Sequence, residues 1–170
     1  SIRKIKSLKT KKGRDAENLF LIEGKRLVEE YLLKSDLVNE VLISESKIKN
    51  YYSVLELCNK KKIKISLTTD SISRKLSDTK TPSGLLATCK INLLVRKNFN
   101  SSRWLFLHEI KDPGNLGTIL RSAAWFNIKN IALSKDCIDP FNNKVVRSAM
   151  GAHIYLNIHK GMQVDEFVKN

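Results

Sequence analysis

Apolar runs of strand length alternate with segments of helical periodicity, and this alternation restricts the chain to α/β architectures. Residues 45–62 show the helical pattern, since Ile48, Tyr52, Leu55 and Cys58 fall on one face and are expected in a core. Strands that alternate with helices in this way predict a largely parallel sheet. The predicted strands are 19–24, 38–43, 63–67, 85–89, 104–108, 130–133 and 153–158, and the predicted helices are 25–34, 45–62, 70–77, 118–126, 142–150 and 164–170.

The alternation breaks at residues 91–102, INLLVRKNFNSS, which end in Asn and Ser and are typical of an interdomain linker. We therefore expect a first domain at residues 1–90 and a second at residues 103–170. The second segment supplies about three strands, which would leave the edge of an open sheet bare, although such edges are normally covered. On these grounds we expect the chain to be truncated at its C-terminal end.

Positive charge is concentrated at the N-terminus of this chain, whose formal net charge is +14. The first 14 residues, SIRKIKSLKTKKGR, hold seven Lys or Arg and no acid. So basic a segment is expected to bind phosphate backbones, with an affinity that falls steeply with salt. A proteome in which every protein is Lys-rich would produce the same excess without a nucleic-acid partner. A membrane surface is a weaker alternative, because the early Leu and Ile residues are too few for a broad apolar face.

Several classes of protein are disfavoured by what the sequence lacks. No apolar run approaches the ~18–20 residues of a membrane span, and the basic N-terminus has no apolar core of a signal peptide behind it. The Cys residues show no CxxC spacing, which argues against a zinc site and a disulfide framework and fits a reducing cytoplasm. Cys58 and Cys89 lie in apolar patterns and are expected in the core. The His residues are too dispersed for a metal site.

The most distinctive stretch is 108–125, HEIKDPGNLGTILRSAAW. A strand is expected to end at His108, a loop rich in Gly and Pro to follow, and a helix to start near Leu116. Ligands in open α/β sheets bind beyond the carboxyl ends of the strands, where this loop would lie. Gly114 and Gly117 allow positive φ or the close approach of another backbone or a ligand.

Two polar residues of this stretch are candidate site residues. Asn115 lies near the expected helix start, where its side chain can cap. Arg121 falls on one polar face with Thr118 and Ser122. The plainer alternatives are that Asn115 is only a cap and that Arg121 is a solvated surface residue. A dinucleotide site is disfavoured, because the glycines lack GxGxxG spacing, and no Gly-Lys-Ser/Thr of a P-loop follows.

The segment DPGNLGTILRSA resembles the first signature motif of the SpoU branch of the SPOUT methyltransferases, and DPFNNKVVRSAMGAHIYLNI is similar to the next stretch of that family. The N-terminal part resembles the family's accessory substrate-binding domain, a ribosomal-protein-like α/β unit. That likeness rests on Lys11-Lys12-Gly13-Arg14, on FLIEGKRLVEE at 20–30 and on TPSGLLA at 81–87. The resemblance implies an RNA substrate-binding domain followed by part of a Rossmann-like SPOUT domain with an α/β knot.

The same resemblance implies methyl transfer from S-adenosylmethionine to a ribose 2′-hydroxyl of RNA. The separate N-terminal domain and the basic N-terminal segment favour rRNA over tRNA. Asn115 and Arg121 correspond to the conserved polar pair of the family. Because the pKa of arginine exceeds ~12, Arg121 is expected to stabilise the developing alkoxide rather than to act as a base, with Asn115 orienting it or the loop. Lys11, Lys12, Arg14 and Arg147 are the expected RNA contacts.

The chain also departs from the family pattern. A later Gly-x-Glu-x-x-Gly loop and a Ser-Leu-Asn segment, which in the family form the knot that holds the cofactor, are absent from these 170 residues. The cofactor-binding residues are therefore expected beyond Asn170, the 170 residues are expected to be inactive alone, and the full-length protein is expected to be a homodimer. A non-catalytic RNA-binding protein of ribosomal type is the alternative. A nucleotide-binding α/β enzyme is disfavoured by the missing glycine pattern.

Overall fold

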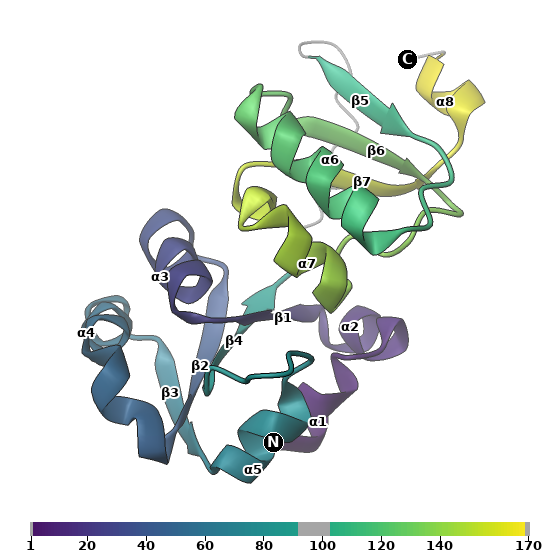
Figure 1. Ribbon diagram of the computed structural model, residues 1–170. Coiled ribbons are helices and arrows are strands. Elements are labelled where there is room, and N and C mark those ends of the chain that lie inside the picture. The colour runs from purple at the N-terminus through teal and green to yellow at the C-terminus, as the bar shows by residue number, and fades with distance from the viewer. Residues whose placement is uncertain (1, 92–102, 169–170) are drawn as a thin grey trace. The chain divides into compact units, whose positions relative to one another are not determined.

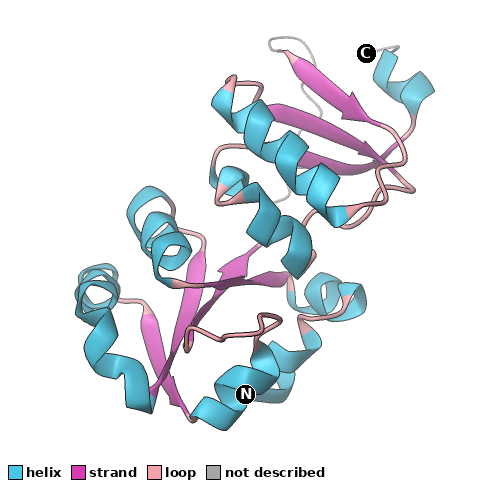
Figure 2. Cartoon of the chain, viewed as in Figure 1, coloured by secondary structure: helices cyan, strands magenta, loops and turns pink. Residues whose placement is uncertain are grey.

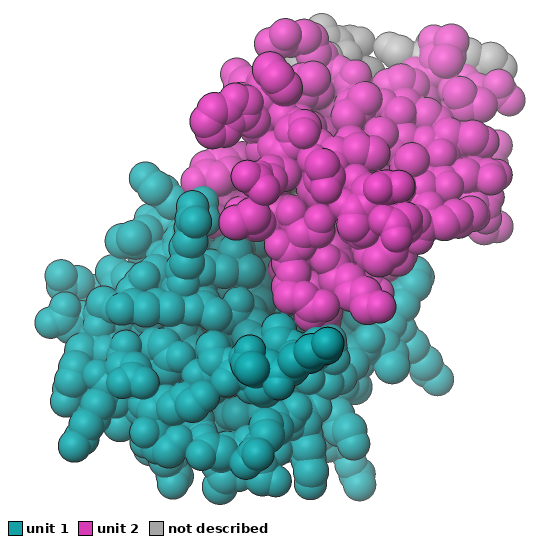
Figure 3. All heavy atoms as spheres, in the orientation of Figure 1, with its two compact units in different colours: residues 1–91 teal, residues 92–170 magenta. Residues whose placement is uncertain are grey.

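The chain forms two compact units, Ser1–Ile91 and Asn92–Asn170, which Figure 3 colours separately. A computed structural model describes residues 2–91 and 103–168, so all of the predicted linker 91–102 except Ile91 lies outside the described residues. Within the described ranges, no helix has the length and apolar character required to cross a membrane.

Unit 1 contains a mixed sheet in which β4 lies between β1 and β2. The order of its strands is β1 (Leu19–Glu23), β4 (Leu85–Lys90), β2 (Val38–Ser44) and β3 (Lys64–Thr68). β4 is antiparallel to both β1 and β2, and only β2 and β3 are parallel. The prediction of a largely parallel sheet is therefore wrong for unit 1. The reason is the path of the chain after β3: α5 (Asp70–Leu76) leads into β4 at the edge of the sheet where β3 ends, instead of returning to the opposite edge as a parallel crossover does.

Helices cover both faces of this sheet, α3 (Lys25–Lys34) and α4 (Tyr52–Lys61) on one side and α1 (Ile2–Ser7), α2 (Lys11–Glu17) and α5 on the other (Figure 1). Successive residues of a strand point to opposite faces. Leu21 accordingly packs with Leu8 and Leu76, whereas the ring of Phe20 contacts the ring of Tyr31 on α3.

One predicted core residue of unit 1 is exposed. The segment 45–62 begins as a 3₁₀ helix, η1 (Glu45–Tyr51), before α4 starts. A 3₁₀ helix has three residues per turn, so it shifts the phase of the apolar stripe. Tyr51, Val54 and Cys58 are buried as a result, while the side chain of Tyr52 is 66% exposed. The predicted burial of Cys58 and Cys89 is confirmed.

Unit 2 contains a three-stranded parallel sheet, β5 (Trp104–Leu107), β6 (Asn130–Ser134) and β7 (Asn157–Met162), as predicted. The helices α6 (Pro113–Trp125) and α7 (Asn143–Ala149) pack on one face of it (Figure 2). On the other face, Phe167 of α8 (Val164–Val168) contacts the rings of Trp104 and Phe106.

The last strand of unit 2 starts later than predicted. Residues 153–158 were expected to be extended, but Ala152–Ile154 form a 3₁₀ turn, η2, and β7 begins at Asn157. The backbone turns sharply there, because Met150 (φ 47°) and Gly151 (φ 90°) both adopt left-handed conformations. The predicted strand at 153–158 is therefore wrong in its first four residues.

Candidate active site

The loop between β5 and α6 is fixed by the chain that follows β6. The backbone N–H of Glu109, a residue at φ 50°, donates to Ser134 Oγ at 3.0 Å. The N–H of Ile110 lies 3.3 Å from Cys137 Sγ, and Ile110 O accepts from the N–H of Ile138 at 2.8 Å. The loop at the carboxyl end of β5 is thus held in one conformation before α6 begins.

The helix α6 begins three residues before its predicted start. Asp112 is its N-cap, and Asp112 Oδ1 accepts from the N–H of Asn115 at 2.7 Å. Pro113 occupies the first turn, where its missing N–H costs no hydrogen bond. The prediction that the Asn115 side chain caps this helix is therefore wrong, because the aspartate three residues earlier has that role.

Gly117 allows α6 and α7 to approach closely. An ideal Cβ on Gly117 would lie 2.4 Å from Ser148 Cβ and 2.8 Å from the Val145 carbonyl oxygen. The same contact includes a hydrogen bond from Ser148 Oγ to the carbonyl oxygen of Gly114 at 3.1 Å. The sequence suggested either a positive φ or a close approach of another segment at Gly117, and the structure shows the close approach.

We expect Gly117→Ala to destabilise unit 2 by about 1–3 kcal/mol, since overpacking a tight helix contact forces the backbones apart. Both Trp residues of the chain, Trp104 and Trp125, belong to unit 2, so tryptophan fluorescence during urea unfolding follows this unit. The control is Thr118→Ala on the exposed side of α6, which should change stability by less than about 0.5 kcal/mol. A Gly117→Ala variant as stable as the control would contradict the close packing.

Arg121 lies on the exposed face of α6 and contacts Met150, which ends α7. Its Nη1 donates to Met150 Sδ at 3.2 Å. Thr118 and Ser122 are exposed beside it, as the helical spacing predicted. Asn115 is six residues from Arg121, about 9 Å along the helix axis, so in this structure Met150 rather than Asn115 fixes the guanidinium. The sequence did not predict this contact, because nothing in it indicates a left-handed conformation at Met150.

The predicted RNA contacts differ in their exposure. Lys11 and Lys12 are exposed, and Lys11 pairs with Asp15 at 2.8 Å. Arg147 on α7 is half-buried. Arg14 is only 2% exposed, and its Nη1 donates to the carbonyl oxygen of Leu8 at 2.8 Å. Its prediction as an RNA contact is wrong, because the basic segment folds into two helices that enclose this guanidinium.

His153 is a buried neutral group next to the turn that holds Arg121. Its Nε2 donates to the carbonyl oxygen of Pro140 at 2.8 Å, and burial lowers the pKa of His153 to about 4.

In unit 1, burial raises the pKa of Cys58 to about 11, so that thiol is protonated at neutral pH. Across residues 2–91 and 103–168, no three His, Cys, Asp or Glu side chains gather as a metal site would require.

Comparison with known families identifies both units. The MRM3-like substrate binding domain matches residues 1–87, and the SpoU rRNA Methylase family matches residues 102–170. The 23S rRNA (guanosine(2553)-2′-O)-methyltransferase RlmP of Bacillus subtilis (strain 168) is 34% identical over 154 residues, which are 90% of this chain and 58% of RlmP. The mitochondrial rRNA methyltransferase 3 of Xenopus laevis is 31% identical over 164 residues, 92% of this chain and 38% of that protein.

A solved structure supports the fold. The AdoMet-bound rRNA methyltransferase from Sinorhizobium meliloti superposes with a TM-score of 0.81 at 21% identity, covering 99% of this chain and 63% of that one. The chain thus spans about 58% of the length of the Bacillus relative. The resemblance that the motifs indicated is confirmed. The chain belongs to the SpoU rRNA methylase family and carries an MRM3-like substrate binding domain in its first unit.

Proposed function

We propose that the protein acts in the 2′-O-methylation of a ribose in rRNA, with S-adenosylmethionine as the methyl donor. The observation that carries this proposal is Arg121, which is exposed on the helix of the family motif and held by Met150. The Bacillus relative, named as a 23S rRNA 2′-O-methyltransferase, supports the substrate. We do not favour a non-catalytic RNA-binding protein of ribosomal type, because RNA binding alone does not require the DPGNLG loop followed by Arg121.

In the proposed reaction, Arg121 stabilises the ribose oxygen as it attacks the methyl group. As the bond from that oxygen to the methyl carbon forms, the methyl–sulfur bond of the donor would break to leave a neutral thioether, and the hydroxyl proton would pass to water or to an RNA phosphate oxygen. Negative charge develops on the ribose oxygen during this step. A guanidinium stays protonated at neutral pH and offers five N–H donors. One is directed at Met150 Sδ, which leaves four for the ribose oxygen and an adjacent phosphate. The arginine therefore acts electrostatically, as the donors of an oxyanion hole do.

When bound, S-adenosylmethionine supplies the electrophilic methyl group. The side chain of Glu109 is 53% exposed at the carboxyl end of β5, and a carboxylate there can accept a hydrogen bond from a ribose hydroxyl of this cofactor. The other cofactor-binding residues are proposed to lie beyond Asn170, because the family's Gly-x-Glu-x-x-Gly and Ser-Leu-Asn segments are absent from these 170 residues.

Methylation of a 23S rRNA transcript by the full-length protein tests the proposed function. With methyl-labelled S-adenosylmethionine, label should enter the RNA at a nucleotide that then resists alkaline cleavage, because that cleavage requires a free 2′-hydroxyl. Label on a base, or no incorporation into either rRNA or tRNA, would refute the proposal.

We propose Lys11, Lys12 and Arg147 as RNA contacts and expect Lys11→Glu/Lys12→Glu to weaken RNA binding and flatten its salt dependence. Each lost phosphate contact should reduce the slope of log K against log salt by about 0.7–0.9. The matched control is Lys60→Glu/Lys90→Glu, which changes the net charge equally at other exposed positions of unit 1. Fluorescence anisotropy with an RNA 20-mer measures both. An unchanged affinity and slope would place the RNA contacts elsewhere.

We also propose a homodimer for the full-length protein, on the family resemblance, and a cytoplasmic location, because the dispersed cysteines fit a reducing compartment. Light scattering measures the first. The Xenopus relative is named as mitochondrial, so cell fractionation decides between the two compartments.

A further inference from the structure

A pocket lies at one edge of the sheet in unit 1. The carboxyl ends of β1, β2 and β3 meet at this edge, and β4 starts there because it runs antiparallel to its neighbours. The pocket has a volume of about 300 Å³ and is lined from η1, from α5 and from residues 81–84. Its charged lining residues are Lys47, Asp70 and Arg74.

The wall formed by residues 81–84 is held in place by several hydrogen bonds. Lys47 Nζ donates to the carbonyl oxygen of Pro82 at 2.9 Å, and the Tyr51 hydroxyl donates to that of Ser83 at 2.7 Å. Gly84 has φ +80°, and an ideal Cβ there would lie 2.8 Å from Lys47 Cδ. The glycine therefore lets the lysine side chain pass across the loop, and the pocket is formed before any ligand arrives.

The charged groups of the pocket favour an anion. The Asp70 carboxylate accepts hydrogen bonds from the Ser44 and Ser46 hydroxyls, which lower its pKa. Lys47 and Arg74 outweigh this single negative charge, and Arg74 is anchored by a hydrogen bond from Nε to the Asp70 carbonyl oxygen at 3.4 Å. A planar guanidinium beside an ammonium is a combination suited to phosphate.

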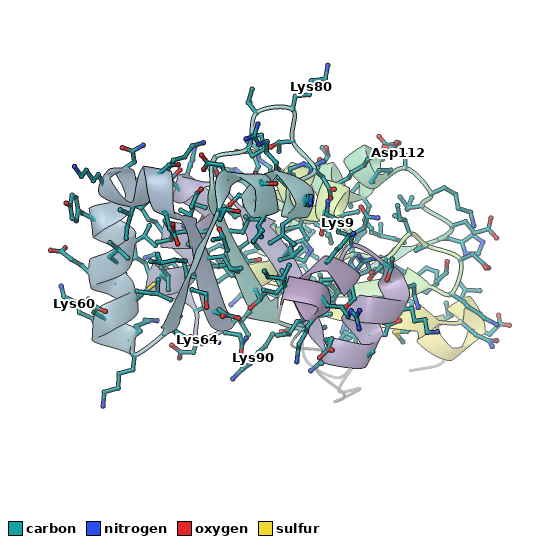
Figure 4. The ribbon with its side chains drawn as sticks, turned by 90° about the horizontal axis from the view of Figure 1, so that it is seen from below. Lys9, Lys60, Lys64, Lys80, Lys90 and Asp112 are labelled. Carbon is teal, nitrogen blue, oxygen red and sulfur yellow. The ribbon has the colours of Figure 1, made fainter. Side chains whose placement is uncertain are left out.

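Positive charge extends beyond the pocket on the same side of unit 1. Lys80 projects from the loop before β4, on the side opposite Lys60 and Lys90 (Figure 4). Lys9 donates to the carbonyl oxygen of Ser77 at 3.1 Å and pairs with Asp78 at 2.9 Å, which brings the basic N-terminal segment beside this loop. A single small anion at Lys47 and Arg74 would leave Lys80 without a phosphate, whereas a polynucleotide could reach all three.

We propose that this pocket binds the backbone of the RNA substrate, with Lys47 and Arg74 on one phosphate and Lys80 on a neighbouring one. The identity of the anion rests on the proposed function. The site itself rests on the pocket, its fixed wall and its cations. Backbone contacts of this kind place an RNA in register without reading its sequence.

Charge reversal on the two sides of unit 1 tests this site in the 170-residue chain. We expect Arg74→Glu/Lys80→Glu to weaken binding of a single-stranded RNA 20-mer about tenfold at 0.1 M salt and to reduce the salt slope by about 1.4, the value for two phosphate contacts. The control, Lys60→Glu/Lys90→Glu, carries the same change in charge and should alter affinity less than twofold. The milder Arg74→Gln/Lys80→Gln removes the same two contacts without adding repulsion, so it should show a similar slope change with a smaller loss of affinity. Thermal unfolding checks that each variant is folded.

If Arg74→Glu/Lys80→Glu and Lys60→Glu/Lys90→Glu lost RNA affinity equally, the proposed site would be refuted, because the effect would then come from net charge alone. An unchanged RNA affinity of Arg74→Glu/Lys80→Glu, or no RNA binding by the wild-type chain, would refute the proposed site as well. Failure here is distinguishable from failure of the proposed function, since ribose methylation by the full-length protein is measured separately and depends on Arg121.

Discussion

Arg121→Ala should lower the rate of 2′-O-methylation by the full-length protein about 10²–10³-fold, the loss typical of one oxyanion donor. The loss should appear in kcat, because the charge that Arg121 opposes develops only in the transition state. S-adenosylmethionine affinity should be nearly unchanged. Single-turnover methylation with saturating RNA and cofactor measures the effect.

Two further variants make this test specific. Ser122→Ala changes the neighbouring exposed side chain of α6 and should leave the rate within a few-fold of wild type. Met150→Leu conserves volume but removes the sulfur that accepts from Arg121, so it should cost less than Arg121→Ala. An Arg121→Ala enzyme that loses cofactor affinity but keeps its rate at saturation would refute the assigned role.

The stability of unit 2 should fall by roughly 3 kcal/mol between pH 6.5 and pH 4 because of His153. Burial lowers the pKa of His153 from 6.5 to about 4 in the folded chain, whereas the unfolded chain protonates this ring near pH 6.5. The unfolded state therefore binds the extra proton first. The stabilisation is complete above pH 6.5 and is lost as the pH falls toward 4.

His153→Gln is the matched control, since its amide does not titrate and can still donate to the carbonyl oxygen of Pro140. Urea unfolding followed by tryptophan fluorescence at several pH values compares the two chains. Asp139 interacts electrostatically with His153 and remains in both, so the difference between them isolates the imidazole. Parallel pH dependence in wild type and variant would show that His153 does not contribute.

The sequence pattern predicted most elements of this fold but not the direction of β4. An apolar run reads the same for a parallel and an antiparallel strand, so Leu85–Lys90 carried no information about its direction. Helix length did not distinguish the two cases either, since α5 and α7 both have seven residues, yet only α7 lies in a parallel crossover. In unit 2 the parallel prediction is confirmed.

Side-chain roles were harder to predict than elements. Arg14 was predicted as an RNA contact from its charge alone. Composition does not show that α1 and α2 fold over this side chain and bury it. Asn115 and Asp112 both suit an N-cap, and the following Pro113 was the signal that the helix starts at the aspartate. The contact of Arg121 with Met150 depends on a left-handed backbone at a non-glycine residue, which periodicity does not reveal.

The position of β4 has a consequence for how unit 1 is made. β4 is the last strand of this unit along the chain, yet it lies between β1 and β2 and pairs with both. Until Lys90 has left the ribosome, β1 has no strand beside it and the β2–β3 pair has a bare edge. Partners such as Leu19 and Lys90 are far apart in sequence, which slows folding. The sheet of the first unit can therefore be completed only after its final strand has been synthesised.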